Sequence, residues 1–349
     1  MRQNGKNAVL KHGGYLMAFS GTRTYHRMAS AIEDAGFIIK DMISWNYSSG
    51  FPKALDISKA LDKKLGAERE IIGRNPNSRE NCDKSNTLYE SGTVGKTAYI
   101  TTPSSNIAKQ YDGYKTALKP AHEPIVLAMK PLEGTFADNV LGYGTGGLNI
   151  DGTRIGNEKV ITKGGDENTH KFFNGGFKEV NIEHEGRYPA NFIISEDIAP
   201  ILDEQSGFSK SVRSNRSVGF NDSNIYGAGN INFKTVRGHN DKGGASRFFY
   251  NAKIENEDYI PFFYTAKCSK KERGENNNHP TVKPKSIMKY LAKLGIPPYD
   301  AVILDMFAGS GSTALAIEEL NKETGRNHKT ILIEREEEYC DIIRKRLIL

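Results

Sequence analysis

The most constraining stretch of this sequence is VILDMFAGSGSTALAIEEL, residues 302–320, near the C-terminus. A β-branched apolar run, a Gly-x-Gly turn and an alanine-rich helix are typical of open α/β sheets that bind an adenine cofactor at the turn. Such a turn usually follows the first strand of a domain, yet only residues 321–349 remain after it. We therefore expect most of the sheet to come from earlier parts of the chain.

Alternating strand and helix patterns begin close to the N-terminus. The pattern predicts strands at 14–20, 37–45 and 122–130, and helices at 24–35 (with Gly36 as C-cap) and 52–65. Further along it predicts an exposed loop at 73–97, strands at 187–195, 260–266 and 329–334, and helices starting at Pro284 and at 336. This order favours an α/β fold with a doubly wound, mostly parallel sheet.

Composition excludes few classes of function. The chain has 349 residues and a net charge of +6, a mild bias towards polyanionic partners. No run reaches the roughly 18 apolar residues of a membrane span, and residues 1–12 lack the apolar core of a signal peptide, so a cytoplasmic protein is expected. Cys82, Cys268 and Cys340 form no CxxC pair, so we predict no disulfide framework and no metal site.

The glycine turn has a candidate acidic partner on the next strand. Gly309 and Gly311 would let the backbone approach a ligand, and Ser312 or Thr313 could cap the following helix. Glu334 lies 25 positions after Gly309, where its carboxylate could accept hydrogen bonds from ribose hydroxyls. The alternatives are a plain strand-to-helix turn and a charge at the start of the last helix. Together the two features favour an adenosine-type cofactor.

Two cofactors fit this pattern. A nicotinamide dinucleotide needs the glycines and the helix N-terminus for its pyrophosphate. S-adenosylmethionine has no phosphate and needs an acid for its ribose and another near its methionine amine. Asp305 could supply the second acid or could simply cap a turn. The late position of the unit favours S-adenosylmethionine.

With Asp305, Phe307, Gly309 and Gly311 set after NHPTVKPKSIMKYLAKLG (278–295), the C-terminal third resembles the β-group of DNA amino-methyltransferases. Residues 13–61, 117–132 and 186–194 are also similar to its phage and prophage members. The resemblance implies methyl transfer from S-adenosylmethionine to adenine N6 or cytosine N4 in double-stranded DNA, of the kind used in restriction-modification. It also implies a Rossmann-like methyltransferase fold in which the catalytic half of the sheet precedes the cofactor half.

The resemblance assigns site residues position by position. Asp305, Phe307, Gly309 and Gly311 would line the S-adenosylmethionine pocket, Glu334 would hold the ribose, and Thr281 and Lys283 would close over the methionine end. A proline-braced loop leading into a helix is the alternative for Thr281 and Lys283.

The resemblance also divides the chain into three parts. Residues 1–133 would form the catalytic half, 134–250 an inserted Gly/Asn-rich target-recognition region, and 251–349 the cofactor half. Basic residues outnumber acidic ones within 205–250, which suits a DNA-facing surface, although a solvated loop has the same composition. The basic set is Lys210, Arg213, Arg216, Lys234, Arg237, Lys242 and Arg247, against Asp222 and Asp241.

The catalytic tetrapeptide of that family, Asp/Asn/Ser-Pro-Pro-aromatic, is not found in this sequence. The one Pro-Pro pair, Pro297-Pro298, follows Ile296 and directly precedes the cofactor strand, so we reject it and assign no catalytic residue. The motif would precede the 14–20 strand, so we expect an N-terminally incomplete methyltransferase that takes a complementing N-terminal fragment as partner. Without that strand, the 14–20 strand would expose unpaired backbone.

Two other functions compete with an active methyltransferase. The first is a DNA- and cofactor-binding fragment without chemistry of its own, as the absent tetrapeptide suggests. The second is a nicotinamide-dependent oxidoreductase with a permuted sheet. The sequence has no recognisable proton-relay motif, although His12, His26 and His122 could take part in one. The HPTVKP loop argues against the oxidoreductase.

Overall fold

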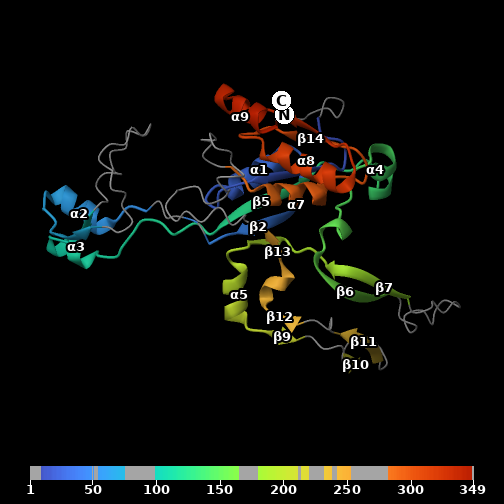
Figure 1. Ribbon diagram of the computed structural model, residues 1–349, viewed down its shortest axis with the longest axis horizontal. Coiled ribbons are helices and arrows are strands. Elements are labelled where there is room, and N and C mark those ends of the chain that lie inside the picture. Colours follow the sequence, from blue (N-terminus) through green and yellow to red (C-terminus); the bar gives the residue numbers. More distant parts are fainter. Residues whose placement is uncertain are drawn as a thin grey trace. The chain divides into compact units, whose positions relative to one another are not determined.

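A computed structural model describes residues 9–48, 50, 54–74, 99–164, 180–210, 214–219, 232–237, 242–252 and 282–347 (Figure 1). The chain divides into two compact units. The main unit comprises residues 1–48, 122–258 and 267–349, and the inserted unit comprises residues 49–121 and 259–266.

A five-stranded sheet forms the centre of the main unit. Its order is β1 (Tyr15–Phe19), β5 (His122–Met129), β2 (Ile38–Asn46), β8 (Phe192–Ser195) and β13 (Tyr250–Ala252). β2, β8 and β13 are parallel neighbours, whereas β5 runs antiparallel to both β1 and β2. Four of the five strands therefore run in the same direction, so the sheet is mostly parallel as expected, but β5 makes it mixed. Strand periodicity locates β5 but carries no information about its direction.

Helices cover both faces of this sheet. β5 is buried from Glu123 to Met129, as expected for a strand covered on both sides. On one face, Ile125 and Leu127 pack against Ile287 and Leu291 of α7 (Lys285–Gly295). α1 (Tyr25–Asp34) packs against β5 and β2 but contributes nothing to that cluster, so we place it on the other face.

The C-terminal elements follow the order that the sequence predicts. α7 is followed by β14 (Val302–Asp305), α8 (Ser312–Thr324), β15 (Lys329–Leu332) and α9 (Glu337–Leu347). β14 and β15 pair in parallel as a separate two-stranded sheet, and α8 packs on α7. The strand expected at 260–266 lies outside the described residues.

The region from 134 to 250 contains a short helix followed by antiparallel pairs. After α4 (Phe136–Tyr143), β6 (Ile155–Gly164) pairs with β7 (Val180–Arg187), β9 (Ser209–Lys210) with β12 (Lys242–Gly243), and β10 (Ser214–Gly219) with β11 (Asn232–Arg237). α5 (Ala199–Ser206) contacts the short 3-10 helix η4 (Ala245–Phe248), where Asp203 accepts the Ser246 N–H at 2.8 Å. β8 lies inside this region of sequence but belongs to the central sheet.

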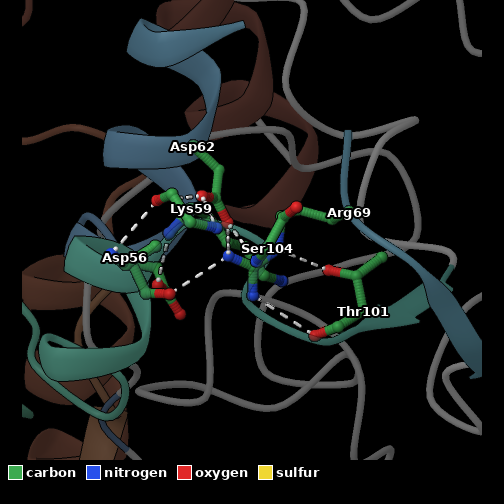
Figure 2. A network of polar contacts seen from close by, with 9 residues as sticks. Asp56, Lys59, Asp62, Arg69, Thr101 and Ser104 are labelled. Atoms are coloured by element: carbon green, nitrogen blue, oxygen red, sulfur yellow. Dashed lines mark hydrogen bonds and ion pairs between the residues drawn. The ribbon is translucent and has the colours of Figure 1, made fainter. Parts of the chain in front are cut away.

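The inserted unit is built around the buried carboxylate of Asp62 (Figure 2). Its elements are α2 (Ile57–Leu65), β3 (Ile71–Arg74), β4 (Tyr99–Thr101) and α3 (Asn106–Gln110). α2 starts later than the 52–65 pattern predicts, because Asp56 is its N-cap and accepts the Lys59 N–H at 3.1 Å. Most of the loop expected at 73–97 lies outside the described residues.

Candidate cofactor site

The glycine turn lies between β14 and α8 and uses backbone conformations that favour glycine. Gly309 has φ +54° and Gly311 has φ +81°. A Cβ at Gly311 would also lie 3.2 Å from Cγ1 of Ile343 in α9. These glycines therefore shape the turn and bring it close to the last helix.

Glu334 connects the glycine turn to the start of α9. Its Oε2 accepts the Gly309 N–H at 2.8 Å, and its Oε1 accepts the N–H groups of Arg335 at 2.8 Å and Glu336 at 3.0 Å. The sequence pairs Glu334 with the turn, and the structure brings the two together. It also gives Glu334 the helix-start contacts that were the alternative.

Asp305 ends β14 and organises the other side of the turn. Its Oδ1 accepts the Phe307 N–H at 3.0 Å, and its Oδ2 accepts the Thr313 hydroxyl. The expectation that Ser312 or Thr313 caps α8 is wrong. The N-cap is Gly311, which has no side chain to form a cap, and Thr313 bonds Asp305 instead.

Three N–H groups of the turn are already occupied, which limits the ligands that the turn can bind. Phe307 and Gly309 donate to the two carboxylates, and the Gly311 N–H donates to the Ala308 carbonyl at 2.8 Å. A pyrophosphate bound at such a turn would need free N–H donors and no negative charge beside them. The two acids instead suit hydroxyls and a positively charged group.

Two neighbouring contacts complete the turn. Arg346 of α9 donates from Nη1 to the Ser310 carbonyl at 2.6 Å and to its hydroxyl at 3.0 Å, which ties the helix to the turn. The Phe307 side chain is 88% exposed, so its ring is available to a ligand.

Lys283 lies against the five-stranded sheet. Its Nζ is 2.9 Å from Oε2 of Glu123 and 5.0 Å from the centroid of the Phe19 ring. Burial lowers the pKa of Lys283 to about 8. Thr281 lies outside the described residues, so its predicted role stays a prediction.

The course of α7 relates Lys283 to the glycine turn. Lys283 lies beside Phe19, the last residue of β1, and the helix begins two residues later. The helix ends near Met17, whose Cε would lie 3.0 Å from a Cβ at Gly295, and its Leu294 carbonyl accepts the Asn149 N–H. Ion pairs from Lys285 to Glu319 and from Lys289 to Glu323 show that α8 runs in the same direction as α7, so the glycine turn before α8 lies near the end of α7 at which Lys283 lies. We infer that Asp305, which ends β14, and Lys283, which lies beside the carboxyl end of β1, are at the edge where α/β sheets bind ligands.

Sequence reasoning missed Glu123 and the role of Thr313. Glu123 could have been found, because an acid inside the apolar run of 122–130 needs a partner when it is buried. Thr313 could not, because the hydroxyl of a residue in the first turn of a helix is expected to cap that helix. Pro297-Pro298 lies at the amino end of β14, away from Asp305.

The part of the chain that the structure describes holds no group of three or more His, Cys, Asp or Glu side chains arranged to bind a metal ion. Within the same part, no helix is both long and apolar enough to cross a membrane.

These features define an open α/β protein with an acid-lined glycine turn at the carboxyl end of a strand. The family described as DNA methylase matches residues 6–345, and the chain belongs to that family.

Individual relatives are more distant. The chain is 26% identical over 144 residues to the Type II methyltransferase M.HindIII of Haemophilus influenzae; the match covers 40% of this chain and only 34% of that protein. Among solved structures, it is similar to M1.HpyAVI in complex with SAM (TM-score 0.36, 14% identity, 97% of this chain and 76% of that chain). The structure titled M1.HpyAVI gives a TM-score of 0.35 and 12% identity over 97% of this chain and 74% of that one.

Proposed function

We propose that this chain binds S-adenosylmethionine and DNA and belongs to a methyltransferase that modifies an exocyclic amine, adenine N6 or cytosine N4. Family membership supports the DNA substrate. The observation that carries the cofactor is the acid-lined turn, in which Asp305 and Glu334 accept the Phe307 and Gly309 N–H groups and place two negative charges where a dinucleotide phosphate would need none.

The residues present fit this cofactor. Glu334 keeps lone pairs for ribose hydroxyls while it holds Gly309, and Asp305 places a negative charge beside a cationic methionine end. The exposed ring of Phe307 offers a surface for the adenine. When bound, S-adenosylmethionine supplies the methyl group, attached to a positively charged sulfur.

The chain's contribution to the reaction is orientation. Holding the methyl carbon in line with the base amine lowers the entropic part of the barrier. Lys283, fixed by Glu123 and Phe19, braces the segment before α7 at the carboxyl end of β1. The target base would have to leave the helical stack to reach this edge of the sheet.

Incorporation of labelled methyl from S-adenosylmethionine into unmethylated DNA by the purified chain tests the proposal. Cofactor binding is measured separately by calorimetry. Binding together with incorporation is the expected result for an enzyme complete in one chain. Absence of cofactor binding by the folded chain contradicts the proposal.

Two open strand edges favour a second candidate, a binding protein that becomes active only when another polypeptide adds a strand. Among the described residues, β1 pairs only with β5, and β14 only with β15. The Ser20 N–H donates to Pro124 O and the Lys130 N–H donates to Gly14 O, both at 2.9 Å. The peptide groups of the even-numbered residues of β1 therefore hydrogen-bond to β5. The peptide groups of Tyr15, Met17 and Phe19 therefore point to the other edge.

β14 shows the same pattern at its own edge. The Lys329 N–H donates to Ala301 O and the Ile333 N–H donates to Asp305 O, both at 2.8 Å. The peptide groups of the odd-numbered residues of β14 therefore point towards β15. The peptide groups of Val302 and Leu304 therefore point away from β15, and no described strand pairs with them. A strand supplied in trans would find hydrogen-bond partners at these edges. Cofactor binding without methyl incorporation is the result expected for this second candidate.

A further inference from the structure

The inserted unit is attached at the edge of the sheet where the candidate site lies. Asn46 at the end of β2 pairs with His122 at the start of β5, so the chain leaves and returns at one place. β1 runs in the same direction as β2, because both are antiparallel to β5. The two connections of residues 49–121 therefore lie at the carboxyl ends of β1 and β2, where Lys283 meets Glu123.

A buried charge network holds the inserted unit together (Figure 2). Asp62 of α2 is fully buried, and its oxygens accept the N–H groups of Ser104 and Ser105, both at 3.0 Å, and Arg69 Nη1 at 2.6 Å. Arg69 also donates from Nε to the Thr101 hydroxyl at 3.0 Å. Burial alone would raise the pKa of Asp62, but these hydrogen bonds, with that of the Ser105 hydroxyl, outweigh it and hold the pKa well below its ordinary value. The start of α3 is thereby fixed to α2.

The turn after α3 presents aromatic and basic side chains from this fixed base. Tyr111 is 43% exposed and Tyr114 60% exposed, and their rings meet edge to face with centroids 5.3 Å apart. Gly113, with φ +83°, makes the turn between them. Lys109 and Lys115 flank the pair and are both exposed.

Positive charge dominates the described surface of the inserted unit. Seven exposed residues are basic and three are acidic. The basic ones are Lys59, Lys63, Lys64, Arg74, Lys109, Lys115 and Lys119, and the acidic ones are Glu68, Glu70 and Asp112. Among the described residues of this unit, the ion pair is the buried one between Asp62 and Arg69, and it includes none of the seven exposed basic residues.

We infer that the inserted unit is a second DNA-contacting element, in which Lys109 and Lys115 bind phosphates and the Tyr111–Tyr114 pair packs against exposed bases or sugars. Ammonium groups beside exposed aromatic rings are the combination that binds nucleic acid without sequence preference. The choice of DNA rests on the proposed function.

The test measures binding of the full chain to a fluorescein-labelled 30-base-pair duplex by anisotropy at several salt concentrations. The Lys109→Gln/Lys115→Gln variant is expected to bind about tenfold more weakly, with a salt slope lower by about 2, because two phosphate contacts are lost. Tyr111→Leu/Tyr114→Leu is expected to weaken binding several-fold without changing the slope. The matched control Lys322→Gln/Lys345→Gln removes two exposed charges from α8 and α9 and should bind like the unchanged protein.

Calorimetry with S-adenosylmethionine on the same preparations reports on the proposed function independently, and hydrogen exchange confirms that each variant is folded. Unchanged DNA affinity and slope in both unit variants would overturn the inference, even if cofactor binding is intact. The inference would also be overturned if the unmodified chain bound the cofactor but not the DNA duplex. Loss of cofactor binding in the unmodified chain would instead contradict the proposed function.

Discussion

At the scale of single residues, the candidate site depends on carboxylates that serve two purposes. Asp305 and Glu334 hold the turn together through hydrogen bonds and give it negative charge. Lys283 and Glu123 form the other charged pair at this edge of the sheet. Both pairs of residues can be tested by removing charge while shape is kept.

Glu334→Gln is expected to weaken S-adenosylmethionine binding about tenfold or more, because a charged acceptor is replaced by a neutral one with a single acceptor oxygen. Calorimetry measures the affinity. Glu337→Gln is the matched control: it removes the same charge at the start of α9, where Glu337 bonds Arg344 and not the turn. Equal affinities for the two variants would contradict the role of Glu334.

Lys283 should make stability depend on pH in the alkaline range. Its pKa falls from 10.5 to about 8 on folding, so between these values the unfolded chain binds more protons than the folded chain. The contribution of Lys283 to the free energy of unfolding therefore rises with pH across this window, by on the order of 2 kcal/mol. Urea unfolding of the unmodified chain and of Lys283→Met from pH 7.5 to 10.5 measures the difference. A difference between the two proteins that does not change with pH would show that Lys283 is solvated.

At the scale of elements, the ends of α8 separate two effects of a glycine. Gly311 and Gly325 both have positive φ, at the N-terminal and C-terminal ends of the helix. A Cβ would meet Ile343 at the first position and nothing within 4 Å at the second. The two sites therefore differ mainly in their surroundings.

Gly325→Ala is expected to lower the free energy of unfolding by about 1 kcal/mol through backbone strain alone. Gly311→Ala should cost about 1–2 kcal/mol more, because the added methyl group lies against Ile343 and the turn shifts away from α9. Urea unfolding of both variants measures the difference. Equal losses would mean that α9 yields to the extra methyl group.

At the scale of the whole molecule, residues 49–121 of the inserted unit lie in the chain between two strands, β2 and β5, that pair with each other. β2 and β5 pair along most of their length, up to Asn46 and His122, and Ser48 beyond β2 donates its N–H to Asp197 at 3.1 Å. The main unit keeps its central sheet and its glycine turn without residues 49–121. It should therefore fold without them.

Replacement of residues 49–121 by a four-residue Asn-Gly-containing turn is expected to leave a chain that unfolds cooperatively and binds S-adenosylmethionine within about twofold of the full protein. Circular dichroism and calorimetry measure these properties. Loss of cooperative unfolding would show that the main unit depends on the inserted one. Loss of cofactor binding alone would show that the inserted unit contributes to the pocket.

Local sequence patterns are enough to predict most of the strands and helices of the main unit and the glycine turn. The strands and helices around 14–46, 122–130 and 302–347 follow from local periodicity, and a Gly-x-Gly turn with an acid 25 residues later needs only local chemistry. Three features can be found only in the folded chain: the antiparallel direction of β5, the hydrogen bond from Thr313 to Asp305, and the ion pair of Lys283 with Glu123. Each of these joins residues through space, and their energies depend on burial and direction that no local pattern encodes.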